Sequence, residues 1–247
     1  MKVNISKSTY VFLLISFLAG YFEYMYLLLL IIFVHESGHY FFAKIVGFNS
    51  CKIVIYPFGG LTQYNEDLNT STNKELFVLL GGIIFQLLFY YLTLVLCNNL
   101  YVTYHVFNII KRINILLISF NFLPVLPLDG GKLLNIILDK LLPYKVSNIV
   151  TIVISIIFSL VFLFNKITIF RILLFIFLLK NIIYEIKNVD YKYYSFLLER
   201  YLYNYKFNKI KIIKSKNLFR RDYNHIINNT FEESYLHNLF DSKEYLC

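Results

Sequence analysis

The feature that most constrains this chain is a His-Glu-x-x-His motif, His35-Glu36-Ser37-Gly38-His39, inside an apolar run that begins near Met25. Residues i and i+4 lie on one helical face, so both histidines can direct their rings at one metal ion. Glu36 lies off that line, where a carboxylate reaches a water molecule that the metal has made acidic. Because ionisable side chains are costly in an apolar helix and usually mark function, the motif predicts a zinc site within a membrane.

The same motif also occurs on surface helices of soluble proteins, where it binds no metal. Here the apolar residues 31–34 and 40–42 flank it, so it has no solvated face to occupy. Two histidines and a glutamate without partners in hydrocarbon would be hard to explain. The flanking sequence therefore favours the metal site.

Composition indicates a polytopic membrane protein. Of the 247 residues, 58% are hydrophobic and only 16% are charged, which is unusual for a soluble chain. The net charge of +9 lies largely after residue 186, where it argues for a cytoplasmic end and only weakly for nucleic acid. Cys51, Cys97 and Cys247 are scattered and form no Cys-x-x-Cys pair, so neither a disulfide framework nor a cysteine zinc site is indicated.

Hydropathy predicts an all-α polytopic membrane protein with about six transmembrane helices, a small membrane-associated β-hairpin and a short cytoplasmic tail. We expect the helices near residues 10–22, 25–46, 75–97, 113–128, 146–164 and 167–186. Six spans place both termini on one side, and the excess of Lys and Arg after the last helix assigns that side to the cytoplasm. The expected domains are an intramembrane domain over 1–187 and a basic cytoplasmic tail over 188–247.

The β-hairpin is expected over residues 51–64, where β-branched residues precede Pro57 and a pair of glycines. An ordinary interhelical loop explains this stretch equally well. Open strand edges are unstable in lipid, so a hairpin here should pack on protein or line a wet cavity beside the site. Its unpaired edge could hold an extended peptide by strand addition.

A second informative stretch begins at Asn121, where Pro124 and Pro127 break the helix and free backbone groups. Such breaks at membrane depth are tolerated where they line a functional cavity. Asn121 could hydrogen-bond a substrate backbone or a developing oxyanion. It could also serve only to pack two helices together.

Asp129 follows this break at the edge of an apolar segment, and apart from Glu36 no carboxylate is better placed. We therefore predict Asp129 as the third zinc ligand. Two histidines, one aspartate and a water complete a tetrahedral catalytic site with an open position. In isolation, Asp129 could equally cap a helix before Gly130-Gly131.

Taken together, His35-Glu36-Ser37-Gly38-His39 and Asn121-x-x-Pro124-x-x-Pro127-Leu128-Asp129-Gly130 resemble the site-2 protease family of intramembrane zinc metalloproteases. Pro57-Phe58-Gly59-Gly60, the six-helix plan and Leu198-Glu199-Arg200-Tyr201 resemble its stage IV sporulation protein FB branch. The resemblance covers about residues 10–201, and the paired motifs are far more specific than either alone.

The resemblance implies one zinc ion and a set of site residues with three roles. These are the zinc ligands His35, His39 and Asp129, the catalytic residue Glu36, and the substrate-positioning residues Asn121, Pro124, Pro127, Phe58, Gly59 and Gly60. The family cleaves membrane-associated proteins near the cytoplasmic face, and this branch processes a sigma-factor precursor under control of small membrane proteins. Members usually end in a CBS domain; about 60 residues follow the last helix here, so no complete CBS domain is expected.

Two other functions are compatible with parts of the pattern. A non-catalytic membrane adaptor could keep zinc for structure, but a structural site normally has four protein ligands. A di-iron oxidase needs clustered histidines, and only His35 and His39 are paired here. The lipid bilayer, a protein substrate and regulatory membrane proteins are the expected partners, with no direct nucleic-acid binding.

Overall fold

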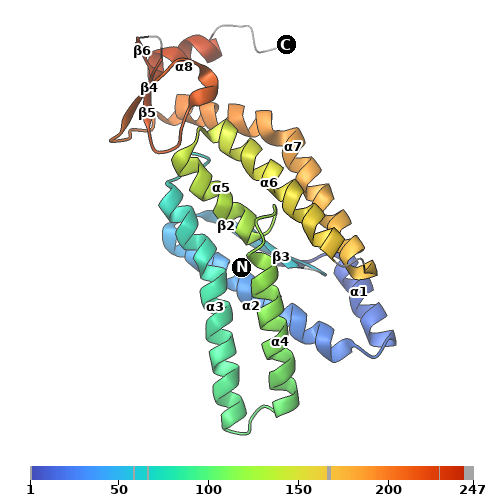
Figure 1. The fold of residues 1–247 in the computed structure, drawn as a ribbon. Helices are drawn as coiled ribbons and strands as arrows, with labels where there is room; N and C mark the ends of the chain where they lie inside the picture. Colours follow the sequence, from blue (N-terminus) through green and yellow to red (C-terminus); the bar gives the residue numbers. More distant parts are fainter. Residues whose placement is uncertain (1, 58, 66, 166–167, 228, 242–247) are drawn as a thin grey trace. The chain divides into compact units, whose positions relative to one another are not determined.

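The computed structural model describes residues 2–57, 59–65, 67–165, 168–227 and 229–241. Within these ranges the chain is mostly helical, with two small three-stranded sheets (Figure 1). It forms two compact units. Unit 1 comprises residues 1–66 and 76–121, and unit 2 comprises residues 67–75 and 122–247.

The helices of unit 1 are α1 (Lys7–Leu18), α2 (Phe22–Val46), α3 (Thr72–Asn98, from Leu76 onwards) and α4 (Tyr104–Asn121). Helix α1 begins where the Ser6 hydroxyl accepts a hydrogen bond from the Thr9 amide, a common N-cap arrangement. Helix α2 ends at Gly47, whose φ of 91° is readily adopted only by glycine. This helix matches the expected span at 25–46 and carries the His-Glu-x-x-His motif.

The sheet of unit 1 has the order β1-β2-β3, formed by β1 (Lys2–Ile5), β2 (Asn49–Tyr56) and β3 (Gly59–Asn65). Strands β2 and β3 are antiparallel, so the expected hairpin is confirmed. Strand β1 pairs with β2 in parallel and was not anticipated, since we expected the N-terminus only to lead into a helix. Strand β3 therefore lies at one edge of the sheet.

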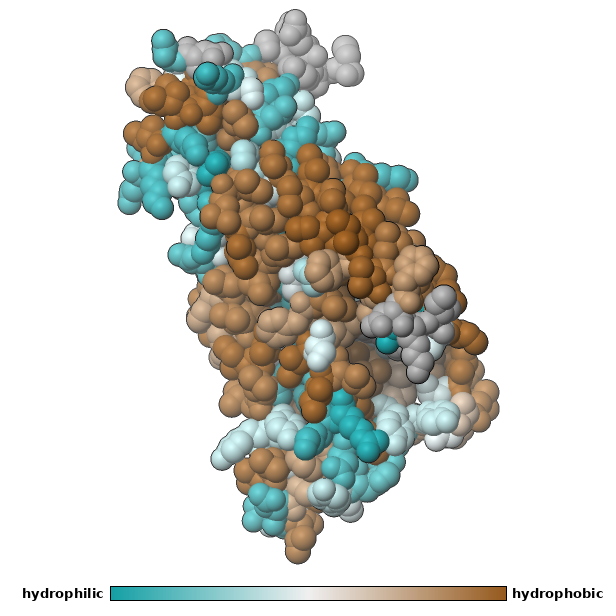
Figure 2. All heavy atoms as spheres, viewed as in Figure 1, coloured by the Kyte–Doolittle hydropathy of each residue, from teal (hydrophilic) through white to brown (hydrophobic). Residues whose placement is uncertain are grey.

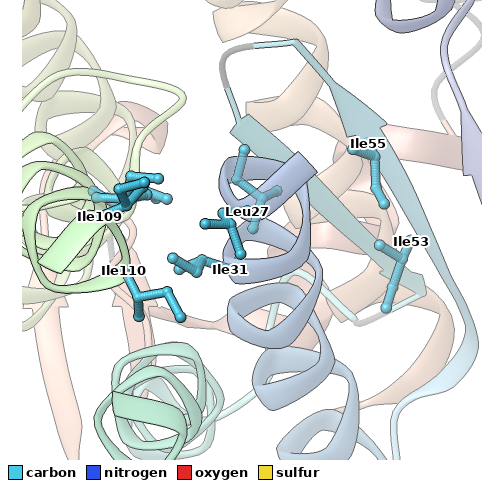
Figure 3. Packing of buried hydrophobic residues seen from close by; sticks show 9 residues of the cluster. Leu27, Ile31, Ile53, Ile55, Ile109 and Ile110 are labelled. Atoms are coloured by element: carbon cyan, nitrogen blue, oxygen red, sulfur yellow. The ribbon is translucent and has the colours of Figure 1, made fainter. Parts of the chain in front are cut away.

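The core of unit 1 forms around α2. Ile53 and Ile55 project from the sheet toward Leu27 and Ile31 of α2, while residues of α4, including Ile109, approach the same helix from another side (Figure 3). Burial of such side chains stabilises the unit by roughly 1.5–3 kcal/mol each. The helix that bears the motif is thus held on two sides by packed isoleucine and leucine.

Helices α2 and α3 approach closely at two glycines. A Cβ built on Gly38 would lie 2.2 Å from the carbonyl oxygen of Gly81, and a Cβ on Gly81 would lie 2.7 Å from the carbonyl oxygen of Gly38. No larger residue fits at either position without moving a backbone. Small residues let membrane helices approach in this way, and here the contact brings α3 against the motif.

Unit 2 contains α5 (Asp129–Leu141), α6 (Tyr144–Asn165) and α7 (Ile169–Tyr203). Helix α6 buries small polar residues at every fourth position and exposes apolar ones, as expected where lipid covers the outside. The buried residues are Ser147, Thr151, Ser155 and Ser159, and the exposed ones are Ile149, Val153, Ile157 and Val161. Figure 2 shows the resulting apolar surface along α6 and α7, and the more hydrophilic surface over the end of the chain.

The end of unit 2 is folded to a greater extent than the sequence indicated. It contains β4 (Ile210–Ile213), a 3-10 turn η1 (Lys216–Leu218), β5 (Asn224–Ile227), β6 (Thr230–Phe231) and α8 (Glu232–Asp241). Phe219, Ile227 and Leu236 pack here with Phe196 of α7. The buried guanidinium of Arg200 pairs with Glu232, and that of Arg221 pairs with Asp139 and Glu75.

Three helices of the described residues are long and apolar enough to cross a bilayer: Phe22–Val46, Thr72–Asn98 and Tyr144–Phe164. The first expected span, 10–22, appears as the shorter α1. The expected helix at 113–128 instead occupies 104–121, because the chain leaves the helix before Pro124. Helix α7 runs unbroken from 169 to 203, so it continues well past the expected end of the last span at residue 186.

Candidate active site and metal centre

The motif residues occupy one buried stretch of α2. His35, Glu36 and His39 are 2%, 6% and 4% exposed. Their ligand atoms all lie within 4.8 Å of one another, and the two histidine Nε2 atoms are 3.2 Å apart. The i, i+4 spacing of the helix produces this convergence.

The hydrogen bond at Nδ1 of each histidine defines the tautomer of the ring. His35 Nδ1 is 3.0 Å from Gln86 Oε1, and His39 Nδ1 is 3.0 Å from the Val78 carbonyl oxygen. Because both partner atoms accept hydrogen bonds, each Nδ1 carries the ring hydrogen and donates it. In the neutral rings both Nε2 atoms are then lone-pair donors, which is the form that binds a metal.

The spacing of these two nitrogens fits a tetrahedral zinc ion. Zinc–nitrogen bonds of about 2.0–2.1 Å at a tetrahedral angle place two ligand nitrogens roughly 3.3 Å apart. The observed separation is 3.2 Å. Two unprotonated nitrogens at this distance are suited to share one cation, so the chemistry of the pair matches the predicted metal.

Helix α3 supports the pair from behind. A Cβ on Gly82 would lie 2.5 Å from His39 Nε2 and 2.8 Å from His35 Cε1, so only glycine leaves room for both rings. Gln86, one turn further along α3, is fully buried and its Nε2 reaches the backbone carbonyl oxygen of Asn114 at 3.4 Å. The structure thus gives Gln86 a specific contact with His35.

Glu36 faces the sheet. The Thr62 hydroxyl of β3 lies 2.7 Å from Glu36 Oε2. A Cβ on Gly60 would lie 2.7 Å from Oε1, so the strand backbone also passes directly against this side chain. Thr62 was not singled out from the sequence. A polar residue two positions after the glycine pair, on the same face of a predicted strand, was the available signal.

Asn121 ends α4, and its Nδ2 lies 3.4 Å from His35 Nε2. The structure thus places Asn121 at the motif, and its role in positioning a substrate stays a prediction. Gly60 is also at the motif, whereas a Cβ on Gly59 would meet nothing within 4 Å. Phe58 lies outside the described residues, so its predicted role stays a prediction.

The residues predicted after the helix break belong to unit 2. The stretch from Leu123 to Leu128 turns tightly, with the Val125 carbonyl oxygen accepting a hydrogen bond from the Leu128 amide at 2.8 Å. The Leu126 amide donates to Ser155 Oγ at 3.0 Å, which ties the turn with Pro124 and Pro127 to α6. The expected break in the helix is therefore present.

Asp129 lies in the first turn of α5 and is buried, 3.2 Å from the ammonium of Lys132. Its position after the turn also suits a carboxylate near a helix N-terminus. Since Asp129 belongs to unit 2 and the histidines to unit 1, Asp129 as the third ligand stays a prediction.

Comparison with known proteins finds a matching family and two similar relatives. The model of the peptidase family M50 matches residues 23–104 and 98–164. Stage IV sporulation protein FB of Bacillus subtilis (strain 168) is 27% identical over 206 residues, which cover 81% of this chain and 72% of that protein. A Synechocystis protein (sll0528), named as a candidate zinc metalloprotease, is 33% identical over 103 residues, covering 41% of this chain and 27% of that protein.

A solved structure shares the fold. The site-2 protease from Methanocaldococcus jannaschii superposes with a TM-score of 0.60 at 22% sequence identity. The match covers 74% of this chain and 89% of that one. The two proteins therefore have a common architecture.

Proposed function

This chain belongs to peptidase family M50, and from that membership we propose which of its residues carry out the reaction and on which substrate. It is an integral membrane protein and an intramembrane metalloprotease with the site-2 protease fold, and zinc is its metal. One observation carries the proposal. His35 Nε2 and His39 Nε2 converge at 3.2 Å in an apolar helix, immediately beside a buried glutamate.

His35, His39 and Asp129 hold a single zinc ion in this proposal. The first two present unprotonated Nε2 atoms because each ring keeps its hydrogen on Nδ1, which donates it in a hydrogen bond to Gln86 Oε1 or to the Val78 carbonyl oxygen. When bound, zinc supplies a Lewis acid that polarises the peptide carbonyl and lowers the pKa of a water molecule. Three protein ligands leave the fourth position open, as catalytic rather than structural zinc sites do.

Glu36 moves the proton. Its carboxylate accepts a proton from the attacking water and returns it to the nitrogen of the departing peptide. Burial among apolar residues keeps competing water away from this carboxylate, and Thr62 satisfies one of its oxygens. Asn121, whose amide reaches the His35 ring, donates a hydrogen bond to the substrate carbonyl oxygen as negative charge develops there.

An extended peptide segment is the form in which the substrate binds. Strand β3 is an edge strand, and its second residue, Gly60, lies against the catalytic carboxylate. A peptide added along this edge would pair with the strand backbone. Phe58, Gly59 and Gly60 at one end, and the turn with Pro124 and Pro127, would position its scissile bond.

The substrate is a membrane-associated protein cleaved near the cytoplasmic face, specifically a precursor of a sporulation sigma factor. Similarity over 81% of the chain to a protein named for stage IV of sporulation supports this choice. Small membrane proteins would regulate access to the site. The lipid bilayer surrounds the protein, and no direct nucleic-acid binding is proposed.

The proposed topology has six spans with both termini in the cytoplasm. The intramembrane protease domain covers 1–187, and 188–247 forms a basic cytoplasmic tail. Support comes from the positive charge that follows the last apolar segment. The residues concerned are Lys187, Lys192, Arg200, Lys206, Lys209, Lys211, Lys214, Lys216, Arg220 and Arg221.

Co-expression with a tagged sigma-factor precursor from the same genome tests the proposal, with cleavage scored by size on a gel. Wild type should cleave it, whereas Glu36→Gln and Asp129→Asn should not. Glu23→Gln is the matched control, because Glu23 lies on the same helix but is exposed. A zinc chelator should abolish cleavage by the wild type.

Two outcomes would contradict the proposal in different ways. Cleavage by Glu36→Gln at the wild-type rate would exclude Glu36 as the proton carrier. Zinc retained by the purified wild type, with no cleavage of any candidate, would instead indicate a non-catalytic zinc-binding adaptor.

A further inference from the structure

Thr62 makes a contact with the catalytic carboxylate that the reaction scheme above leaves unused. Its side chain is buried against α2, with the hydroxyl oxygen 2.7 Å from Glu36 Oε2 and 3.1 Å from the Glu36 backbone carbonyl oxygen. A hydroxyl has only one hydrogen to donate. The carboxylate is both nearer and charged, and hydrogen bonds to charged acceptors are the stronger ones. Thr62 therefore donates to Glu36 Oε2.

A second position on β3 restricts the same side chain. A Cβ on Gly60 would lie 2.2 Å from Glu36 Cγ and 2.6 Å from Cδ, so the strand backbone is in contact with the length of the glutamate. Residues two apart on a strand face the same way. Gly60 and Thr62 thus meet Glu36 together, one by close packing and the other by a hydrogen bond.

The strand itself is held firmly. Thr62 pairs in register with Ile53 and Gly60 with Ile55, and both isoleucines are buried in the core around α2. The hydroxyl of Thr62 is therefore presented from a rigid element on the side that faces α2. The unpaired edge of β3 lies in the plane of the sheet, away from that side chain.

We propose that Thr62 is a positioning residue for peptide hydrolysis: it holds Glu36 Oε2 and leaves Oε1 to exchange the proton with water. This inference rests on the proposed function, in which Glu36 is the proton carrier. The terminal torsion of a glutamate is broad and roughly two-fold, so packing alone does not set the plane of its carboxylate. A directed hydrogen bond does, and correct orientation of a reacting group raises the rate of the chemical step.

Thr62→Val tests this, because it removes the hydroxyl and keeps the shape, while Thr62→Ser keeps the hydroxyl. Thr93→Val is the matched control, since Thr93 is also buried but its hydroxyl bonds the Tyr90 carbonyl on α3. With the precursor that wild type cleaves as the substrate, Thr62→Val should lower kcat about 10- to 100-fold, as expected for loss of a hydrogen bond to a charged group. KM should stay within about twofold, because the side chain points away from the peptide edge, and Thr62→Ser and Thr93→Val should remain near wild type.

A binding measurement tests whether Thr62 orients Glu36 without requiring turnover. Acetohydroxamate is the probe: it would chelate the zinc ion and donate its hydroxyl hydrogen to the catalytic carboxylate, so its affinity for the zinc-loaded protein reports the orientation of Glu36. Thr62→Val should weaken this binding about tenfold or more with zinc content unchanged, and Thr62→Ser should restore it.

The outcomes separate this inference from the proposed function. If wild type cleaves, Glu36→Gln is inactive and Thr62→Val matches wild type in kcat and hydroxamate affinity, the positioning role is wrong while the protease assignment stands. Equal loss in Thr62→Val and Thr62→Ser, or a rise in KM alone, would also overturn it. If wild type fails to cleave the precursor, that substrate is wrong, and the hydroxamate affinities still test Thr62.

Discussion

Replacing Gln86 with methionine should weaken zinc binding without removing a ligand. The side chain is fully buried, and its Oε1 accepts the Nδ1 hydrogen of His35 at 3.0 Å. Methionine preserves length but offers no comparable acceptor. The His35 ring then loses the contact that fixes its tautomer and direction.

The size of the effect follows from that single contact. Leaving a buried donor unsatisfied costs about 1–3 kcal/mol. At about 1.4 kcal/mol per tenfold, this corresponds to roughly a 5- to 150-fold rise in the zinc dissociation constant. Changes in the hydrogen-bond partners of metal-binding histidines typically cost about 10–100-fold, which lies in the same range.

Competition against a zinc chelator, with the protein purified in detergent, measures this constant directly. Leu87→Ala is the control, since Leu87 is the neighbouring residue on α3 and faces outward. Thermal unfolding of the zinc-free proteins shows whether the fold is intact. If Gln86→Met is folded and binds zinc as tightly as wild type, the contact with Gln86 does not orient His35 and the reasoning fails.

Further predictions concern the charged residues of unit 2. Arg221→Met should destabilise unit 2 by about 3–5 kcal/mol, because it removes the ion-pair partner of the buried carboxylates of Glu75 and Asp139. Denaturant unfolding should show this loss, with little change for the neighbouring Arg220→Met. Burial raises the pKa of Asp139 to about 6 from 3.8, although Arg221 and Ser147 lower it. Folding therefore favours the protonated carboxyl of Asp139. Its contribution to the free energy of unfolding is fully present below about pH 4 and is lost as pH rises through about 6, by about 3 kcal/mol in all. The free energy of unfolding of wild type minus that of Asp139→Asn should therefore fall between pH 4 and pH 7. A difference independent of pH would show that Asp139 does not titrate in this range.

Local pattern was sufficient for several parts of the fold. The helix with the metal motif and the break at Pro124 follow from short-range rules about periodicity and proline. The same kind of rule allowed either a hairpin or an interhelical loop over residues 51–64, and the structure shows the hairpin. Strand β1 escaped prediction because its pairing partner, β2, lies about fifty residues away and no local signal identifies it. Likewise, the expected spans at 10–22 and 113–128 differed because hydropathy does not mark where a helix begins or ends.

The convergence of His35, Glu36 and His39 could be predicted from the sequence, because the three residues belong to one helix and helix geometry is the same in any protein. Their surroundings could not, because Gln86, Gly82 and Thr62 come from other elements and reach the motif only by packing. The sequence by itself determined the kind of metal site and its place in an apolar helix. The tertiary structure decided which nitrogen of each histidine carries the ring hydrogen and which strand holds the glutamate, since both depend on hydrogen bonds between residues 26 to 51 positions apart.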